Sequence, residues 1–250
     1  MSDAPQQPHL VTRFENELAA LRGLLIEMGA SAANQLALAT RAVIEHDAEA
    51  GARAIEGDPE VDALGGRIEA QVIRMLALRQ PMAEDLRLIV GALRMMVDLE
   101  RIGDYAANVA KRSVVLAQFA LPFSLAGLGT MARLVAEEVT GVVEAIRARN
   151  PERAVAVWRS DQAVDDLYTS IFRELITYMM EDPRNITPCT HLLFIAKNLE
   201  RIGDHATNVA ETLHYAITGQ ALTGARPKGD TSPYAIVRAR EGGDSASAGS

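Results

Sequence analysis

Apolar residues recur along the chain with the spacing of amphipathic helices rather than of strands. Ala, Leu, Glu and Arg dominate the composition, β-branched residues do not alternate with polar ones, and aromatic residues make up only 4% of the chain. Such residues favour helices, and the apolar period is helical. The pattern predicts an all-α fold without strands.

Helix-breaking residues divide this pattern into six long segments. Glycine, asparagine and proline near residues 57–59, 81, 122, 150–151, 183 and 188 mark the joints. The expected helices cover residues 10–47, 49–79 with a break around 57–59, 83–119, 124–149, 151–181 and 187–218. Because the connections are short, neighbouring helices are expected to run antiparallel as two tandem three-helix up-and-down bundles.

Two stretches of the chain are near copies of each other. Residues 98–111 read DLERIGDYAANVAK and residues 198–211 read NLERIGDHATNVAE, with ten of fourteen positions identical. Upstream, DPEVD at 58–62 aligns with DQAVD at 161–165. A repeat of this period indicates a duplicated small domain, so the two bundles are expected to be pseudo-symmetric.

The duplication suggests a division of the chain into four parts. These are a flexible N-terminus at 1–9, a first bundle at 10–120, a second bundle at 121–218 and a tail at 219–250. The tail is rich in Gly, Ser, Ala and Pro and is expected to be disordered. Within it, only YAIV at 234–237 suggests a short docking element.

Net charge, cysteine content and the N-terminal residues limit the kind of binding partner and the cellular location that we expect. A formal net charge of −8 opposes nucleic-acid binding outside a local basic patch, and the sequence contains no such patch. The single cysteine, Cys189, excludes an internal disulfide and is expected to be a small buried apolar group. Residues 1–9 carry no apolar stretch of the kind that a secretory signal needs. We therefore expect a cytoplasmic protein.

One uncharged stretch, residues 113–132, is long enough to span a bilayer. Pro122, Gly127 and Gly129 interrupt it, and the two copies of the repeat lie on either side of it. A membrane span here would place near-identical halves in different compartments. We therefore expect the end of one helix, a turn and the start of the next.

Acidic residues recur four positions apart on the repeated helices. Residues with this spacing are neighbours on a helix surface, and two carboxylates so close repel each other. A pair on each of two adjacent antiparallel helices would bring four carboxylates together, an arrangement that suits a divalent cation. The candidates, one set in each bundle, are Asp58, Asp62, Glu100 and Asp104, and Asp161, Asp165, Glu200 and Asp204.

Other interpretations of these acids stay open. The same acids are also explained as parts of solvated helix faces, on which Arg101 and Arg201 reduce the repulsion between carboxylates. Asp58 precedes Pro59, so it is also a candidate N-cap of a helix with proline at its first position. The glycine between the two acids of each LERIGD copy is unfavourable in an exposed helix and indicates close approach of another helix.

The two repeated segments resemble the signature of a known family. DLRLIVGALRMMVDLERIGDYAANVAKR at 85–112 and LLFIAKNLERIGDHATNVAE at 192–211 are similar to the paired signature of the PhoU family. The resemblance covers about residues 10–218. It implies two three-helix bundles related by a pseudo-twofold axis. It also implies iron, zinc, manganese or magnesium bound at the surface by E/D-x-x-x-D motifs, which fall here on the eight acids named above; Pro59 departs from that pattern.

The resemblance also implies a function. PhoU-family proteins are dimers or higher oligomers that hold the phosphate-starvation response off when phosphate is plentiful. The implied partners are the ATPase subunit of the phosphate ABC transporter and a phosphate-sensing histidine kinase, through which the protein is peripheral to the membrane. A homodimeric negative regulator without enzymatic activity is therefore expected. Arg101 and Arg201 are candidates for partner contacts, because a guanidinium group forms bidentate pairs with carboxylates.

Two alternative functions remain open. The first is a carboxylate-bridged dimetal oxidase, which needs Glu-x-x-His pairs from two helices. None of the eight acids has a histidine three residues later, and the chain has no Gly-x-x-x-x-Gly-Lys nucleotide loop. The second is a helical adaptor whose acidic pairs bind no metal.

Overall fold

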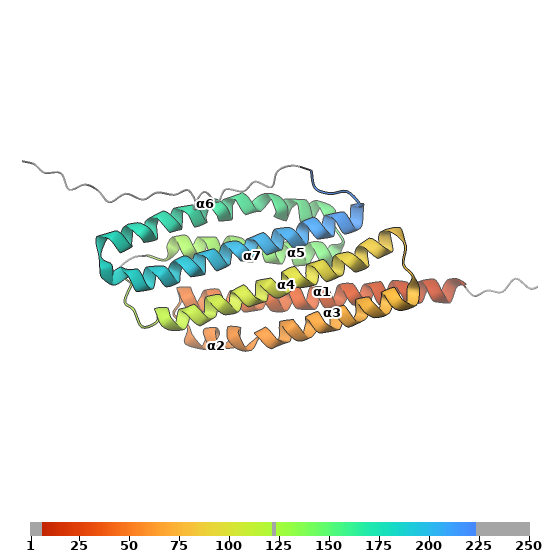
Figure 1. Cartoon of the computed structure of the whole chain (residues 1–250), viewed down its shortest axis with the longest axis horizontal. Helices are drawn as coiled ribbons and strands as arrows, with labels where there is room; N and C mark the ends of the chain where they lie inside the picture. Colours follow the sequence, from red (N-terminus) through yellow and green to blue (C-terminus); the bar gives the residue numbers. More distant parts are fainter. Residues whose placement is uncertain (1–6, 122–123, 224–250) are drawn as a thin grey trace, which may run out of the picture.

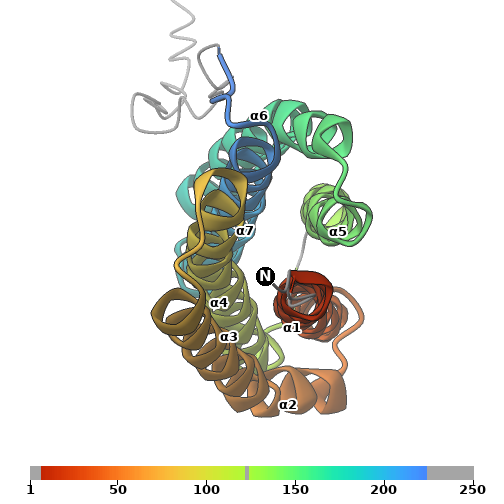
Figure 2. The ribbon, with the colours of Figure 1, turned by 90° about the vertical axis from the view of Figure 1, so that its right-hand side faces the viewer.

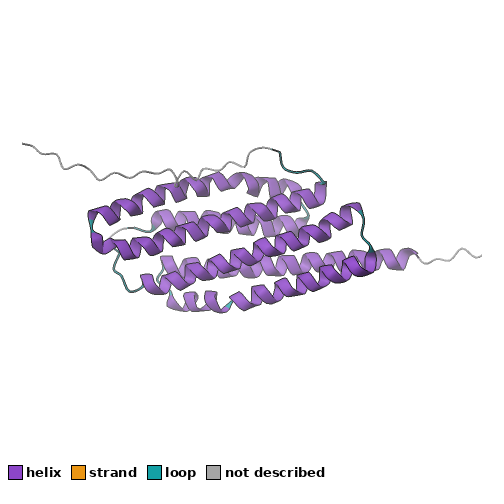
Figure 3. Cartoon of the chain, in the orientation of Figure 1, coloured by secondary structure: helices purple, strands orange, loops and turns teal. Residues whose placement is uncertain are grey.

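A computed structural model describes residues 7–121 and 124–223 of the chain (Figure 1). Most of the expected tail, including YAIV at 234–237, lies outside the described residues, as does the beginning of the expected flexible N-terminus. Within the described ranges the chain is helical and contains no strand (Figure 3). The predicted all-α fold is confirmed.

Six helical rods follow one another along the chain, and the second rod is broken. The helices are α1 (Gln7–Ile44), α2 (Ala48–Glu56), α3 (Asp58–Arg79), α4 (Ala83–Leu116), α5 (Ala126–Ala148), α6 (Pro151–Glu181) and α7 (Ile186–Thr218), with a short 3₁₀ turn, η1 (Pro183–Asn185), before α7. The observed bounds differ by a few residues at most from the predicted ones. Helix α1 begins three residues earlier than expected, inside the segment assigned to the flexible N-terminus.

The two halves pack against each other along their whole length. Viewed from the end, α3, α4, α7 and α6 follow one another in a curved row, and α1 and α5 lie on one side of it (Figure 2). The most extensive helix contact is α4 with α7, and α1 also contacts α5. Buried apolar side chains from both halves form one continuous core. The bundles therefore do not bury separate cores, and the division at residues 120 and 121 stays a prediction.

The turn after the first helix is the same in both halves. His46 and Arg149 both adopt the left-handed conformation, with φ of 56° and 49°. The next residue, Asp47 or Asn150, is an N-cap whose side-chain oxygen accepts a hydrogen bond from the backbone N–H of Ala50 or Arg153. The duplication thus extends to these turns.

The second rod breaks only in the first half. Helix α2 ends at Glu56 and Gly57 is the N-cap of α3, so Asp58 is already helical and its side chain makes no capping hydrogen bond. The interpretation of Asp58 as an N-cap is wrong. Pro59 is tolerated next to it because the first N–H groups of a helix have no intrahelical partner. The second half has the continuous helix α6 in this place.

Residues 113–132 do not form one helix. Helix α4 ends at Leu116 and α5 begins at Ala126. Among the described helices, none is both long enough and apolar enough to cross a bilayer. This agrees with the interpretation of residues 113–132 as a helix end, a turn and a helix start.

The repeated cap makes a stability prediction. Replacing Asn150 by Ala removes the oxygen that accepts a 2.8 Å hydrogen bond from Arg153 N. The loss should cost about 1 kcal/mol of unfolding free energy and lower the Tm by about 2–4 °C. Asn34→Ala, an exposed change inside α1, is the control and should leave the Tm unchanged or slightly higher. Equal losses at both positions, measured by thermal melting followed by circular dichroism, would contradict the capping role.

Candidate functional site

The acids of the second bundle lie inside it rather than on its surface. Asp161 and Asp165 of α6 and Glu200 of α7 are 2%, 4% and 5% exposed. Glu138 of α5, at 3% exposed, joins them. The interpretation as a solvated helix face is wrong for Asp161, Asp165 and Glu200, whereas Asp204 is half-buried. Four carboxylates from three helices are buried here, and a buried charge requires hydrogen-bonded or ionic partners.

Some partners of the buried acids are polar side chains from the same bundle. Lys197 Nζ donates to Glu200 Oε1 at 2.8 Å and lies 4.8 Å from the centre of the Tyr168 ring. Ser160 Oγ donates to Glu138 Oε1 at 3.0 Å. The ammonium group of Lys197 therefore supplies a positive charge beside the cluster.

Gly203 explains how α7 comes close to these acids. A methyl group at residue 203 would lie 3.0 Å from Glu138 Oε2 and 3.3 Å from Asp161 Oδ1. Carboxylates from α5 and α6 thus approach the same point on α7. The prediction that glycine in LERIGD marks a close helix approach is confirmed.

The first bundle carries a more open version of the same arrangement. Gln35 of α1 occupies the position that Glu138 has in the second bundle, and its Oε1 would lie 3.0 Å from a methyl group at Gly103. Gln35 Nε2 donates to Asp58 Oδ1 at 3.3 Å. Asp62 is exposed, whereas Asp58, Glu100 and Asp104 are half-buried. This site has one carboxylate fewer and more contact with solvent.

Neither cluster is arranged as a finished metal site. In residues 7–121 and 124–223, no three Asp, Glu, His or Cys side chains converge as the ligands of one metal ion. The donor types suit a hard divalent cation, since carboxylate oxygens are its preferred ligands. Their positions would have to change on binding, and Glu200 would exchange its contact with Lys197 for a contact with the ion.

The two arginines of the LERIGD copies have different surroundings. Arg101 Nη1 pairs with Asp104 Oδ2 at 2.9 Å on its own helix. Arg201 Nη1 donates instead to the hydroxyl group of Tyr105 at 3.3 Å, across the contact between α4 and α7. Both arginines are exposed, so both can reach a partner protein.

A polar contact between α4 and α7 lies beside Arg201. His205 Nδ1 is 2.7 Å from Asp98 Oδ1, and Asn208 Nδ2 donates to the same oxygen at 3.3 Å. The His205 ring also stacks on Tyr105, with 5.6 Å between ring centres. The side chains of Asp98, Tyr105, His205 and Asn208 are all half-buried. His205 is therefore a structural link between the halves.

Other candidate reactive residues have structural surroundings. Cys189 is fully buried, and burial raises the pKa of its thiol, as expected for an apolar packing residue. The chain does contain one Glu-x-x-His sequence, formed by Glu211 and His214. Glu211 accepts a hydrogen bond from Trp158 Nε1 at 2.6 Å, and His214 Nδ1 lies 3.0 Å from the carbonyl oxygen of Gln220. This pair is separate from the acidic clusters.

The described geometry can be compared with known proteins. A family model described as the PhoU domain matches residues 25–113 and 128–213, one match in each half. The chain belongs to the PhoU family. The two matches coincide with the two halves of the duplication, so the resemblance inferred from LERIGD is confirmed.

Similar PhoU-family proteins cover nearly the whole chain. Two are named phosphate-specific transport system accessory protein PhoU homologs. The protein of Rhizobium meliloti is 46% identical over 89% of this chain and 94% of its own length, and that of Caulobacter vibrioides is 46% identical over 89% of this chain and 97% of its own length. The crystal structure of PhoU from Pseudomonas aeruginosa has a TM-score of 0.80 at 36% identity, covering 83% of this chain and all of that one. Chain length and fold therefore both agree with an accessory protein of phosphate transport.

Two features of this PhoU-family chain escaped sequence reasoning. Glu138 lies outside both repeated motifs, on a helix that contributes no acidic pair. The contact of Asp98 with His205 and Tyr105 was also missed. A signal for it was present, since these positions are among the four at which the two fourteen-residue copies differ. At these positions the two copies carry different side chains, so Asp98 can contact His205 whereas the equivalent pair, Asn198 and Tyr105, cannot form the same ionic contact.

The close approach at Gly203 makes a stability prediction with a matched control. Gly66 lies in α3 with no atom within 4 Å of an added methyl group, so Gly66→Ala should raise the unfolding free energy by about 1 kcal/mol. Gly203→Ala should instead lower it, because the methyl group would push against the buried side chains of Glu138 and Asp161. Urea unfolding measures both. A gain of similar size at residue 203 would mean that the acids move aside without cost.

Proposed function

We propose that this PhoU-family chain is a negative regulator of phosphate uptake and of phosphate-starvation signalling. One observation carries the proposal: similarity to phosphate-specific transport system accessory proteins extends over 89% of this chain and 94% of one relative. Similarity over the full length transfers a function better than similarity of fold, since one fold serves many functions.

The regulator acts by occupying its partners rather than by catalysis. Its implied partners are the ATPase subunit of the phosphate ABC transporter and a phosphate-sensing histidine kinase, which it meets at the cytoplasmic side of the membrane as a homodimer. The continuous core supports this role, because helices that share one core move together as a single body. A displacement caused by binding one partner can then be transmitted through the core to the far end of the molecule.

We further propose that the acids of the second bundle bind a metal ion. The candidate ligands are Asp161, Asp165, Glu200 and Asp204, together with the buried Glu138 beside them, and iron, zinc, manganese or magnesium is the expected ion. Bound there, the ion would neutralise the mutual repulsion of the carboxylates. In the first bundle, Asp58, Asp62, Glu100 and Asp104 remain candidates for a weaker site, because Gln35 replaces one acid.

The metal-free adaptor is the second candidate. The ion pair between Lys197 and Glu200 favours it, since an ammonium group already supplies positive charge beside the buried acids. In this alternative the cluster is a polar contact that fixes the alignment of α5, α6 and α7. The two candidates make opposite predictions about bound metal.

Metal analysis separates the two candidates. The paired change Glu200→Gln with Asp204→Asn keeps the size of both side chains but removes two charged ligands. We expect it to lower the zinc or manganese retained after dialysis by at least half, as measured by plasma mass spectrometry. The control is Asp166→Asn, an exposed acid of α6 that lies outside the cluster. Wild-type protein without stoichiometric metal after loading would support the metal-free adaptor.

Loss of the gene tests the regulatory role itself. Cells that lack this chain should express phosphate-starvation genes even in phosphate-rich medium and should take up excess phosphate, because nothing restrains the transporter and kinase. A reporter of starvation-gene expression measures this directly. A normal, phosphate-repressed reporter in the deletion strain would show that the chain is not the negative regulator.

The exposed arginines test partner binding. Arg101→Ala and Arg201→Ala should weaken binding to the transporter ATPase or the kinase by about tenfold each if they form charge-assisted pairs with partner carboxylates. Arg133→Ala removes another exposed arginine, paired with Glu137 on the same helix, and should leave binding unchanged. Affinity and Tm are measured for each variant. A lower Tm with unchanged affinity would place the interface elsewhere.

A further inference from the structure

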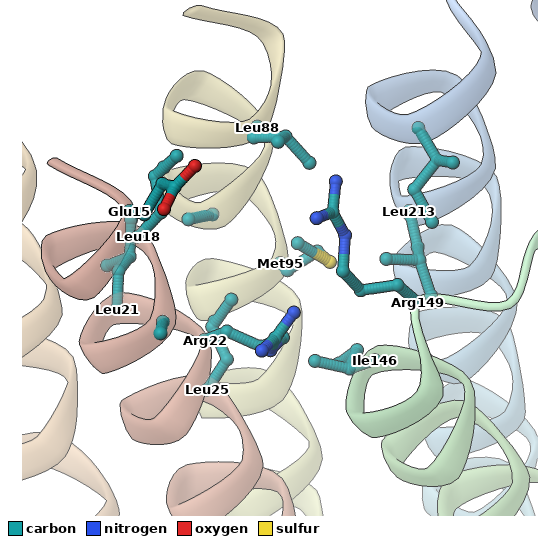
Figure 4. A pocket seen from close by; sticks show the side chains of 13 residues that line it. Glu15, Leu18, Leu21, Arg22, Leu25, Leu88, Met95, Ile146, Arg149 and Leu213 are labelled. Carbon is teal, nitrogen blue, oxygen red and sulfur yellow. The ribbon is translucent and has the colours of Figure 1, made fainter. Parts of the chain in front are cut away.

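A cavity opens at one end of the molecule, where the two halves meet (Figure 4). Its volume is about 310 Å³ and its walls come from α1, α4, α5 and α7. This volume is within the range of small-molecule sites in proteins. The wall is largely apolar and includes Leu18, Leu25, Leu88, Met95, Ile146 and Leu213.

Two arginines stand at this apolar cavity. Arg22 of α1 and Arg149 at the end of α5 extend from opposite sides into the space between the helices (Figure 4). Arg149 pairs with Glu84 at 3.4 Å, but the two side chains are 46% and 57% exposed, so solvent weakens this pair. Arg22 is half-buried and has no ion pair within the described part of the chain. Both guanidinium groups are therefore available to an anion.

The third charge at the cavity, Glu15, is exposed and lies at its edge (Figure 4). Together with Glu84, which pairs with Arg149, it brings the formal charge of the groups at the opening to zero. The site thus combines an apolar interior with one guanidinium group, that of Arg22, that has no ion pair among the described residues. An inorganic anion would have to give up water against leucine side chains, which is costly. A ligand with an apolar body and an anionic head satisfies both parts.

We propose that this cavity binds a free, medium-chain alkyl carboxylate. The alkyl chain lies along the leucines and Met95, and the carboxylate accepts hydrogen bonds from Arg22 and Arg149. Guanidinium groups match this role because their donors pair with both oxygens of a carboxylate. Since the walls come from both halves, the bound ligand links α1 and α4 to α5 and α7. Occupancy therefore stabilises the folded chain.

The chemistry of the ligand is tested on the full chain by isothermal titration calorimetry. Octanoate and decanoate, each below its micelle concentration, should bind once per chain, and affinity should rise about fourfold for each added methylene group. Decyltrimethylammonium has the same tail with the opposite charge and should not bind. Inorganic phosphate should not compete with decanoate. Decanoate should also raise the Tm.

Substitutions at the opening test the assigned positions. Arg22→Gln and Arg149→Gln should each weaken decanoate binding by about tenfold. Glu15→Gln should strengthen it about twofold, because a repelling charge is removed. Ala19→Phe, an exposed change at the cavity wall, should abolish binding by filling the opening. Arg133→Gln is the control and should bind as wild type does, and unliganded melting curves check that every variant folds.

Several results would overturn the proposal. Equal binding of the cationic and anionic amphiphiles would show an unselective apolar surface. Unchanged affinity for decanoate in both arginine variants, together with loss of binding in Ala19→Phe, would show that the carboxylate does not contact Arg22 or Arg149. Binding to anionic phospholipid vesicles without binding to free decanoate would make the opening a membrane contact instead.

Discussion

The contact between α4 and α7 holds the two halves of the chain together. It depends on small residues, since a methyl group at Gly91 would lie only 3.1 Å from the Cβ atom of Ala216. Both helices also carry buried alanines, including Ala106 and Ala206. The apolar faces of α1 and α5 then cover this pair from one side. The polar contact of Asp98 with His205 fixes the alignment of the two helices, because side-chain hydrogen bonds need a defined geometry.

The helices themselves could be predicted because their causes are local. Helix-forming residues, breaking residues and the apolar period are all readable along one segment, and duplication adds the relation between segments. The burial of Asp161, Asp165 and Glu200 was not readable in this way. On a helical projection of α7, Glu200 lies opposite the apolar side, yet α5 and α6 cover that side too. A single helix does not reveal how many neighbours surround it.

The two halves have diverged at the place where their acids gather. Gln35 stands where the second half has Glu138, and the break at Gly57 replaces a continuous helix. One half therefore buries four carboxylates, whereas the other has a half-open site with an amide among the acids. Duplicated sites that differ in charge and exposure differ in the ions or partners that they favour. The exchange of Glu138 for Gln35 lies on helices without acidic pairs, so motif spacing did not reveal it, whereas Pro59 next to the break was readable in the sequence.

The shared core has a consequence for the origin of the chain. A protein made of one half alone would expose the faces of its first and last helices that are buried here against the other half. Two identical copies could cover those faces by pairing about a twofold axis, with each copy using the same surface. The two copies are visible in the present chain in its repeated turns at His46 and Arg149 and in its paired central helices. Fusion of two copies would have made the old subunit interface permanent and freed each copy to change independently.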